Sequence, residues 1–236
     1  MRPDTRHPSH KVAADLRAKI MAGLLKPDEQ LPSTPQLAER YDAAPTTIQN
    51  AVRMLKAEGF VTSRAGAGVY VSRDHAFTVE TAAYYDPASR GVAYRILDVA
   101  ELQPPADVAA ALKEDRAVCR SRLTMRGETP MELSRSYYPM SLAAGTPLTG
   151  RGRIRGGAPA VLADLGYPEL EWTDRVSTRV PTTEEAEILE IPDGVPVLRQ
   201  FRTIFSEDDR PVEVSVLIKP GHLYELTYRQ AVDDEQ

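Results

Sequence analysis

The chain has 236 residues, of which 42% are hydrophobic and 27% are charged, a composition that supports one large or two modest globular domains. It contains no run of about 18 apolar residues, and its polar, proline-bearing first ten residues lack the apolar segment of a secretory signal. We therefore expect no membrane span and a cytoplasmic protein. Its single cysteine, Cys119, excludes an internal disulfide, which fits a reducing compartment.

The net charge of −5 is divided unevenly along the chain. Residues 1–73 carry 11 Lys/Arg and 7 Asp/Glu, whereas residues 74–236 carry 18 and 27. A basic segment can neutralise phosphates, while an acidic remainder limits indiscriminate binding. The charge pattern thus favours a nucleic-acid partner for the N-terminal segment alone.

Three short helices are predicted within the basic segment. An apolar stripe with a spacing of four residues covers Val12–Ile20 and predicts the first helix. The second is expected over Thr34–Tyr41, with Ser33 as its N-cap. The third begins at Pro45, where the missing N–H is harmless, and ends at Gly59.

A small hairpin is predicted after the helices, from strand-like runs at 60–63 and 69–72 that a glycine-rich turn connects. Three helices with a tight turn between the second and third, followed by a hairpin, are typical of a winged helix-turn-helix. The third helix has the dimensions to enter a major groove about 12 Å wide. Residues 1–73 are therefore predicted to form a DNA-binding domain.

Residues 74–91 are predicted to be a linker with one short strand, and residues 92–236 a second domain in which strands alternate with helices. The predicted strands cover 92–99, 118–125, 131–138, 195–205 and 212–218, and the predicted helices cover 106–112, 159–165 and 183–189. Strands joined in hairpins indicate an antiparallel sheet, so the fold class is α+β.

Ordered motifs along the first third of the chain resemble the DNA-binding domain of the GntR family. They are Leu31-Pro32-Ser33, Leu37-Ala38-Glu39-Arg40-Tyr41, Thr46-Thr47-Ile48 and Gly66-Ala67-Gly68-Val69-Tyr70-Val71. The second domain resembles the UTRA effector domain of the HutC subfamily, which has a chorismate-lyase-like fold, through Ser136-Tyr137-Tyr138-Pro139 and Arg210-Pro211-Val212-Glu213. The resemblance implies a homodimer and a repressor that a small-molecule effector releases from DNA.

The chain departs from the family pattern where relatives carry DNA-contacting arginines. Pro35, Pro45 and Gln49 occupy those regions, so the arginine contacts of the family cannot be transferred to them. Ala44 also stands where a small polar cap is expected, which costs the start of the third helix about 1 kcal/mol.

We expect the first turns of the third helix to read DNA, with the cap of the second helix and the hairpin tip touching the backbone. The candidate contacts are Ser33, Thr46, Thr47, Gln49, Asn50, Arg53, Arg64 and Gly66. Gln49 or Asn50 could pair bidentately with adenine, while Arg53 suits a phosphate. The alternative interpretation is a solvated polar helix face.

An effector site is expected on the sheet face that carries Arg120 and Arg122. In relatives that sense sugar phosphates, two arginines and a carboxylate hold the ligand. Here Arg122 matches the first arginine, while Thr124 and Ser134 replace the second arginine and the carboxylate. Threonine cannot supply bidentate guanidinium geometry, so a phosphosugar effector is disfavoured.

The full candidate effector set is Arg120, Arg122, Thr124, Ser134, Tyr137 and Glu213. Two of these residues have alternative interpretations. Glu213 could instead pair with Arg202 across a hairpin, and Tyr137 could pack in the core.

The sequence therefore predicts a DNA-binding transcriptional regulator and not an enzyme, with operator DNA, a second copy of the chain and an unknown small-molecule effector as partners. Neither a cofactor nor a metal is expected, because the four histidines lack ligand spacing. Two-fold symmetry implies half-sites about 34 Å apart.

Two alternatives remain open. One is a small-molecule-binding or lyase-like protein whose winged helix mediates protein contacts. The other is a constitutive repressor without an effector, which the altered positions Thr124 and Ser134 motivate.

Overall fold

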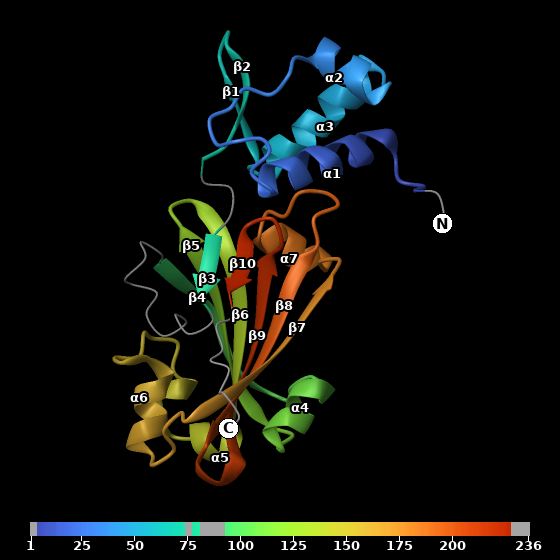
Figure 1. Cartoon of the computed structure of the whole chain (residues 1–236). Coiled ribbons are helices and arrows are strands. Elements are labelled where there is room, and N and C mark those ends of the chain that lie inside the picture. Colours follow the sequence, from blue (N-terminus) through green and yellow to red (C-terminus); the bar gives the residue numbers. More distant parts are fainter. Residues whose placement is uncertain (1–3, 74–76, 81–92, 228–236) are drawn as a thin grey trace, which may run out of the picture. The chain divides into compact units, whose positions relative to one another are not determined.

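The computed structural model describes residues 4–73, 77–80 and 93–227 (Figure 1). The chain divides into two compact units: the N-terminal unit extends to Thr78, and the C-terminal unit begins at Val79, with the segment Pro192–Val195 grouped with the first. Each unit has its own hydrophobic core. The two units are described separately below.

The N-terminal unit contains the predicted three helices and hairpin, in the predicted order. Its elements are α1 (Pro8–Met21), α2 (Thr34–Tyr41), α3 (Pro45–Ala57), β1 (Val61–Arg64) and β2 (Gly68–Val71). Proline lies in the first turn of every helix, where its fixed φ favours the helix and no hydrogen bond is lost. Strands β1 and β2 pair antiparallel, which confirms the winged helix-turn-helix.

The core of this unit is mainly aliphatic, and an ion pair holds its first helix against the end of its third. Leu16, Ile48 and Leu55 are at most 1% exposed and pack in one cluster. At the rim of this cluster, the guanidinium of Arg17 donates to both carboxylate oxygens of Glu58, over 2.6 and 2.5 Å. Such a bidentate pair gives a fixed orientation as well as attraction, so the C-terminal end of α3 is held against α1.

The C-terminal unit is built on a six-stranded antiparallel sheet in the order β4-β5-β6-β9-β8-β7. The strands are β4 (Ala93–Leu102), β5 (Ala117–Arg126), β6 (Thr129–Pro139), β7 (Glu171–Arg179), β8 (Val197–Ser206) and β9 (Arg210–Pro220). Five of the six were predicted, but β7 was missed. A second, two-stranded sheet pairs β3 (Phe77–Glu80), the short strand expected in the linker, with β10 (Tyr224–Thr227).

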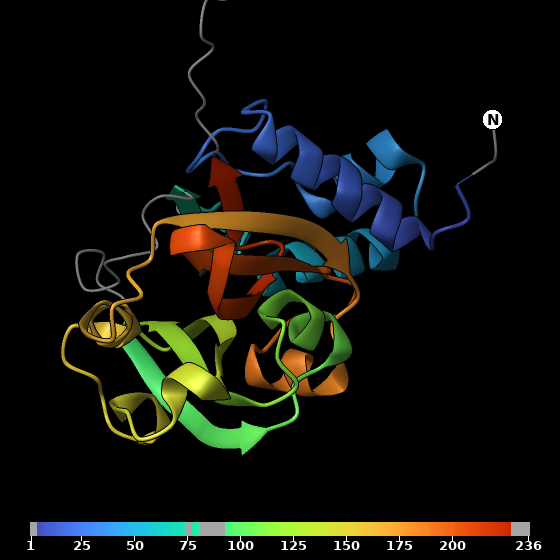
Figure 2. The same ribbon diagram turned by 90° about the horizontal axis from the view of Figure 1, so that it is seen from below.

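Helices cover both faces of the six-stranded sheet (Figures 1 and 2). On one face lie α4 (Ala106–Leu112) and α7 (Thr183–Ile188), which pack on apolar clusters around Val108 and Leu189. On the other face lie α5 (Met140–Ala143), a 3-10 turn at Pro147–Thr149 and α6 (Gly157–Asp164). We call the second surface the α6 face.

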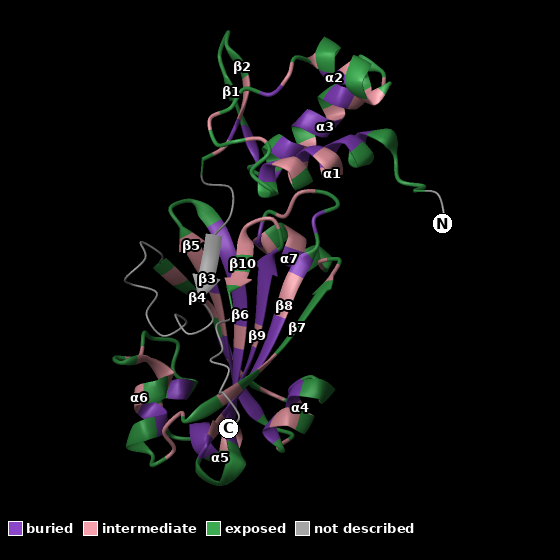
Figure 3. Ribbon diagram, viewed as in Figure 1, coloured by how far each residue is buried: buried purple, intermediate pink, exposed green. Residues whose placement is uncertain are grey.

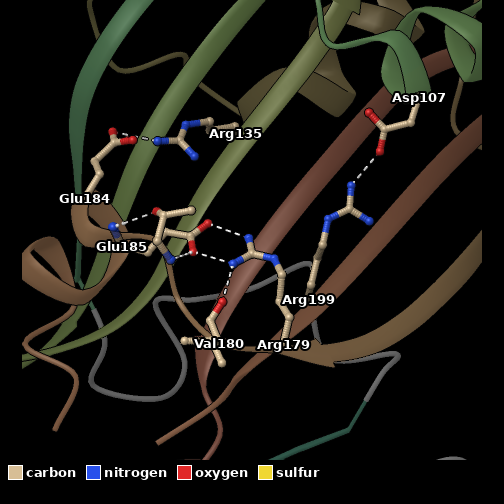
Figure 4. Close-up of polar contacts among 8 residues, drawn as sticks. Asp107, Arg135, Arg179, Val180, Glu184, Glu185 and Arg199 are labelled. Carbon is tan, nitrogen blue, oxygen red and sulfur yellow. Dashed lines mark hydrogen bonds and ion pairs between the residues drawn. The ribbon is translucent and has the colours of Figure 1, made fainter. Parts of the chain in front are cut away.

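Three ion pairs fasten α4 and α7 to the sheet (Figure 4). They are Arg199 with Asp107, Arg135 with Glu184, and Arg179 with Glu185, each at 2.7 Å. The Glu185 side chain is only 4% exposed. Burial alone would raise its pKa, but hydrogen bonds from Arg179 and Thr182 outweigh burial and lower it.

Candidate nucleic-acid interface and effector site

Helix α3 separates its buried and exposed residues cleanly. Ile48 and Ala51 are fully buried against α1 and α2, while Thr46, Gln49 and Arg53 are exposed. This arrangement follows from the 3.6-residue period, which puts positions 46, 49 and 53 on the face opposite the apolar stripe. An exposed polar face on the third helix of a winged helix-turn-helix has the geometry required to enter a major groove.

Two further candidates on α3, Thr47 and Asn50, are half-buried beside that exposed face. Asn50 Oδ1 accepts a hydrogen bond from Arg53 Nη2, so these two side chains orient each other. Because the bond uses the Asn50 oxygen, its amide NH₂ donors keep their capacity for a partner. Thr47 lies in the first turn, where its N–H donates to Ala44 O at 2.9 Å.

The start of α2 is capped as predicted and is exposed. The Ser33 N–H donates to Gln36 Oε1 at 2.8 Å, and the Ser33 hydroxyl donates to the same oxygen at 2.9 Å. A phosphate at this helix terminus would therefore meet a capping pair whose hydroxyl already donates to Gln36.

The hairpin tip is organised around one carboxylate. Asp28 lies in the left-handed region at φ +64 and binds Arg64 at 2.7 Å and Arg73 at 2.5 Å. The hydrogen bond from Arg73, followed by that from Arg64, holds the pKa of Asp28 below its usual value. Arg64 also stacks 4.2 Å from the Tyr70 ring, and Gly66 at φ +69 forms the turn in open space. The structure thus places Arg64 in an ion pair that the sequence did not predict.

On the α6 face of the C-terminal sheet, candidate effector residues are linked by a chain of hydrogen bonds. Arg122 Nη2 donates to the Ser136 hydroxyl at 2.8 Å, and the hydroxyls of Ser136 and Ser215 lie 2.6 Å apart. Ser215 then donates to Glu213 Oε1 at 2.5 Å. The chain joins a half-buried guanidinium to a buried carboxylate across β5, β6 and β9.

Strand register places the other polar candidates around this chain. Arg122 lies opposite Ser134, which is 2% exposed, and Thr124 lies opposite Glu132. Glu213 also lies beside Tyr138, whose pKa is raised well above its usual value by burial and further by the Glu213 carboxylate. Arg122, Thr124, Ser134 and Glu213 thus belong to one sheet face, as the strand alternation requires.

Arg120 shares that face but binds the chain itself. Its Nη1 donates to Leu148 O at 2.8 Å and to Gly150 O at 2.5 Å, and its Nη2 donates to Gly152 O at 3.0 Å. Burial lowers the pKa of this guanidinium, which is 5% exposed. Three carbonyl partners give Arg120 a structural role in holding the loop before α6 on the sheet.

Tyr137 is not brought together with the other candidates. It lies opposite Cys119 on the α4 side of the sheet and packs with Val108, Phe201 and Val214. Because neighbouring residues of a strand point to opposite faces, Tyr137 cannot share a surface with Ser136 or Tyr138.

The alternative interpretation of Glu213, a pair with Arg202 across the hairpin, is wrong because the strand register does not bring the two residues opposite each other. Glu213 lies opposite Ile204, and Arg202 lies opposite Ser215. Arg202 is bound instead by Asp174 of β7, with its Nε donating at 2.8 Å and its Nη2 at 2.7 Å.

Two buried ion pairs on the α6 face were missed from the sequence. One is Arg202 with Asp174, and the other is Lys219 with Glu132 at 2.6 Å; Lys219 also donates to Gln200 Oε1 at 3.1 Å. Arg202 and Lys219 are each 1% exposed. The only available signal was the position of these residues within otherwise apolar strands, because their partners are distant in sequence.

Within the described ranges, no group of three or more His, Cys, Asp or Glu side chains could hold a metal ion. Among the helices of that same part of the chain, none is long and apolar enough to cross a membrane.

A winged helix with an exposed polar recognition helix, followed by an α+β unit, is the arrangement of a DNA-binding transcriptional regulator. Residues 8–71 match the model for bacterial regulatory proteins of the gntR family, and residues 88–225 match the UTRA domain. The chain belongs to the GntR family and carries a UTRA effector domain, the architecture of the HutC subfamily.

Similar proteins cover nearly the whole chain. The HTH-type transcriptional regulator SCO4628 of Streptomyces coelicolor is 29% identical, over 96% of this chain and 94% of its own. The HTH-type transcriptional repressor NagR of Bacillus subtilis is 26% identical, over 93% of each chain. A crystal structure assigned to the GntR family superposes with a TM-score of 0.62 at 26% identity, covering 97% of this chain and 99% of that one.

Proposed function

We propose that this regulator is a repressor that binds a two-fold-symmetric operator as a homodimer and leaves it when a small polar effector binds the α6 face. The observation that carries the proposal is the exposed polar face of α3, with Thr46, Gln49 and Arg53 opposite a fully buried stripe. Half-sites separated by about 34 Å follow from two-fold symmetry. Repression is the activity that the name of NagR gives for that relative.

The contacts on DNA divide into two kinds. Gln49 is proposed to read a base edge, because a carboxamide can pair bidentately with adenine. Arg53, Ser33 and the tip glycine Gly66 are proposed to meet the backbone, which positions the protein without reading sequence.

The effector is proposed to bind between Arg122 and Glu213, which together offer donors and an acceptor. On this face, Arg120, Arg202 and Lys219 bind carbonyls or carboxylates of the chain itself. Arg122 donates to the hydroxyl of Ser136, and the hydrogen-bond chain that begins there ends at the Glu213 carboxylate, so a cation and an anion lie at its two ends. Release from DNA requires that the effector bind one arrangement of the protein better than the other.

DNA binding is tested by selecting bound sequences from a random duplex pool and then measuring affinity by fluorescence anisotropy at several salt concentrations. We expect a palindrome. Arg53→Ala should weaken all sequences alike and lower the salt slope by about 1, whereas Gln49→Ala should cost about 1–3 kcal/mol at one base position only.

The matched control for Arg53→Ala is Arg116→Ala in the C-terminal unit, which removes the same charge from a surface pair with Glu101 at 3.5 Å. It should leave both affinity and salt slope unchanged. If the folded protein enriches no sequence from the pool, the assignment of α3 as the base-reading helix is overturned. If Arg53→Ala and Gln49→Ala behave identically, the division into backbone and base contacts is overturned.

The effector proposal is tested by screening neutral sugars, sugar phosphates and carboxylic acids for release of the selected operator. Any releasing compound should lose its effect on Arg122→Met but keep it on Arg116→Met. If a compound still releases the operator from the Arg122→Met variant, the effector site does not include Arg122 and lies elsewhere. An operator complex that no compound releases would favour a constitutive repressor.

A further inference from the structure

A cleft of about 730 Å³ lies in the N-terminal unit. Its lining residues come from α1, from α2 and from the segment 22–33 that connects them, and none belongs to α3 or to the hairpin. The connecting segment is mostly exposed (Figure 3). The volume of the cleft is in the range of small-molecule sites. The cleft is therefore a possible binding site that is separate from the proposed base-reading face.

The connecting segment supplies the apolar wall of this cleft. Leu24, Leu25 and Pro32 line it, and the Leu24 side chain is 71% exposed. Leu25 packs against the core of the unit but is only partly buried. Contact with an apolar group of a ligand would remove this leucine and proline surface from water, which favours binding.

Most of the charged groups in the cleft are bound within the chain. Asp15 of α1 accepts hydrogen bonds from Lys19 Nζ at 2.6 Å and from the hydroxyl of Tyr41 in α2. Lys19 also donates to that hydroxyl at 3.4 Å. Glu29 Oε2 accepts from the backbone N–H of Lys26 at 2.9 Å. The carboxylates of both lining residues thus have donors of their own.

Arg40 is the exception among the charged residues of the cleft. Its side chain is exposed, and no ion pair of the described residues includes it. The pKa of Asp15 is lowered by the hydrogen bonds from Lys19 and Tyr41 and also by the charge of Arg40, so Arg40 lies within electrostatic reach of the polar wall. A planar guanidinium binds a carboxylate through two parallel hydrogen bonds.

We propose that this cleft binds a small organic carboxylate with an apolar body. Arg40 supplies the donors for the carboxylate, and Leu24, Leu25 and Pro32 supply the surface for the apolar body. The site lies wholly within the N-terminal unit and shares no residue with the α6 face. The inference therefore goes beyond the proposed function and does not depend on the effector site proposed there.

The apolar wall belongs to a segment that also supports the hairpin. The N–H of Leu31 donates to Val69 O in β2 at 2.8 Å. Gln30 Nε2 donates to Ala67 O, next to the hairpin tip, at 2.8 Å. A ligand that contacts residues 24–32 thus touches the segment to which the hairpin is hydrogen-bonded. We expect the ligand to change the affinity for DNA, and DNA to change the affinity for the ligand by the same factor.

The first test uses para-fluorobenzoate as the probe, with binding to the full chain followed by fluorine NMR. We expect saturable binding that Arg40→Gln weakens about tenfold, because a charge-assisted hydrogen bond is lost. Leu24→Ser should weaken it severalfold. Lys11→Gln removes an exposed charge of α1 outside the cleft, and Leu165→Ser removes an exposed leucine of the C-terminal unit. Neither control should change the affinity, and unchanged thermal melting would show that all four variants are folded.

The second test changes the probe and leaves the protein intact. para-Fluorobenzyl alcohol has a similar ring without a charge, and para-fluorobenzylamine has the opposite charge. Both should bind about tenfold more weakly than the carboxylate. An amine that binds as tightly as the carboxylate would show that Asp15 and Glu29 dominate the cleft, and would overturn the assignment of the ligand class.

The remaining outcomes separate this site from the α6 face. If the probe does not bind saturably, the carboxylate site is overturned. If Arg122→Met abolishes binding while Arg40→Gln keeps it, the probe occupies the α6 face and the cleft is again overturned. Saturating probe should change the affinity for duplex DNA by about fivefold or more. An unchanged DNA affinity would overturn the coupling to the hairpin and leave the binding site standing.

Discussion

The two units of this regulator differ in the kind of residue that they bury. In the N-terminal unit the core is mainly aliphatic, and its buried polar residues among those described are Ser9 and Glu58. In the C-terminal unit, arginine, lysine, glutamate and several hydroxyls are buried on one sheet face. The first unit carries its proposed binding residues on the surface, and the second carries them inside.

This difference fits what each unit is proposed to recognise. A DNA groove is met by an outer surface, so the core beneath it can be optimised for stability alone. A small ligand is surrounded, so the groups that bind it must be buried and must satisfy one another when it is absent. The hydrogen-bond chain from Arg122 to Glu213 does this on the α6 face.

The largest effect is expected from breaking a buried charge pair in the C-terminal unit. Asp174→Ala leaves the Arg202 guanidinium, 1% exposed, without this carboxylate, and should lower the free energy of unfolding by about 3–5 kcal/mol. Urea unfolding followed by the fluorescence of Trp172, the single tryptophan, reports on this unit. The double variant Asp174→Leu with Arg202→Met should cost less. If Asp174→Ala alone lowers the free energy of unfolding by less than about 1 kcal/mol, the ion pair does not contribute to stability as expected.

A smaller cost is expected from a cavity in the N-terminal unit. Ile48 is fully buried at the centre of its cluster, and Ile48→Ala should cost about 3 kcal/mol of local stability. Amide hydrogen exchange of α1 and α3 should accelerate, while the Trp172 unfolding curve stays in place. A shift of both would contradict the independence of the two cores.

The cap of α3 offers a gain of about 1 kcal/mol. Ala44 has the extended backbone of an N-cap, at φ −59 and ψ 146, but no side-chain oxygen to accept from the helix. Ala44→Ser supplies that oxygen and should stabilise the N-terminal unit by about 0.5–1 kcal/mol. Slower hydrogen exchange of α3 would measure this. Ala44→Val, which adds bulk without an acceptor, should not reproduce the gain.

The smallest effect is expected from a pH-dependent pair on the surface of the N-terminal unit. Hydrogen bonds from Lys19 and Tyr41 lower the pKa of Asp15 below its usual 3.8. The stabilisation is therefore complete above that value and is lost as the pH falls below it. Asp15→Asn should cost less than about 1 kcal/mol at neutral pH and nothing in strong acid. A difference that grows on acidification would reverse the assigned sign.

Local patterns predicted the fold well. The second helix was placed at its observed bounds, and the fourth helix matches the prediction over Ala106–Leu112, because caps and apolar periodicity are encoded in adjacent residues. Strand β7 was missed because it is an exposed edge whose Glu171–Arg179 segment is largely polar, without the alternation that burial of one face imposes.

The candidate effector site was predictable only from the alternation of side chains between the two faces of a strand. This alternation places Ser134 and Ser136 on one face of the sheet and Tyr137 on the other, so the sequence already contained the signal that separates Tyr137 from the site. The partners of Arg120 and Arg202 were not predictable, because carbonyls near Gly150 and the carboxylate of Asp174 reach them only through the tertiary fold.

Asp28 has a consequence for how the hairpin meets DNA. Its carboxylate binds Arg64 and Arg73 much as a phosphate would, so it competes with the phosphates of DNA for these two side chains. If Arg64 contacts the backbone, it must first exchange one anion for another, and that exchange offsets part of the attraction at every site alike. The protein would then dwell more briefly on random DNA, and its search along a chromosome would depend more on base recognition by α3.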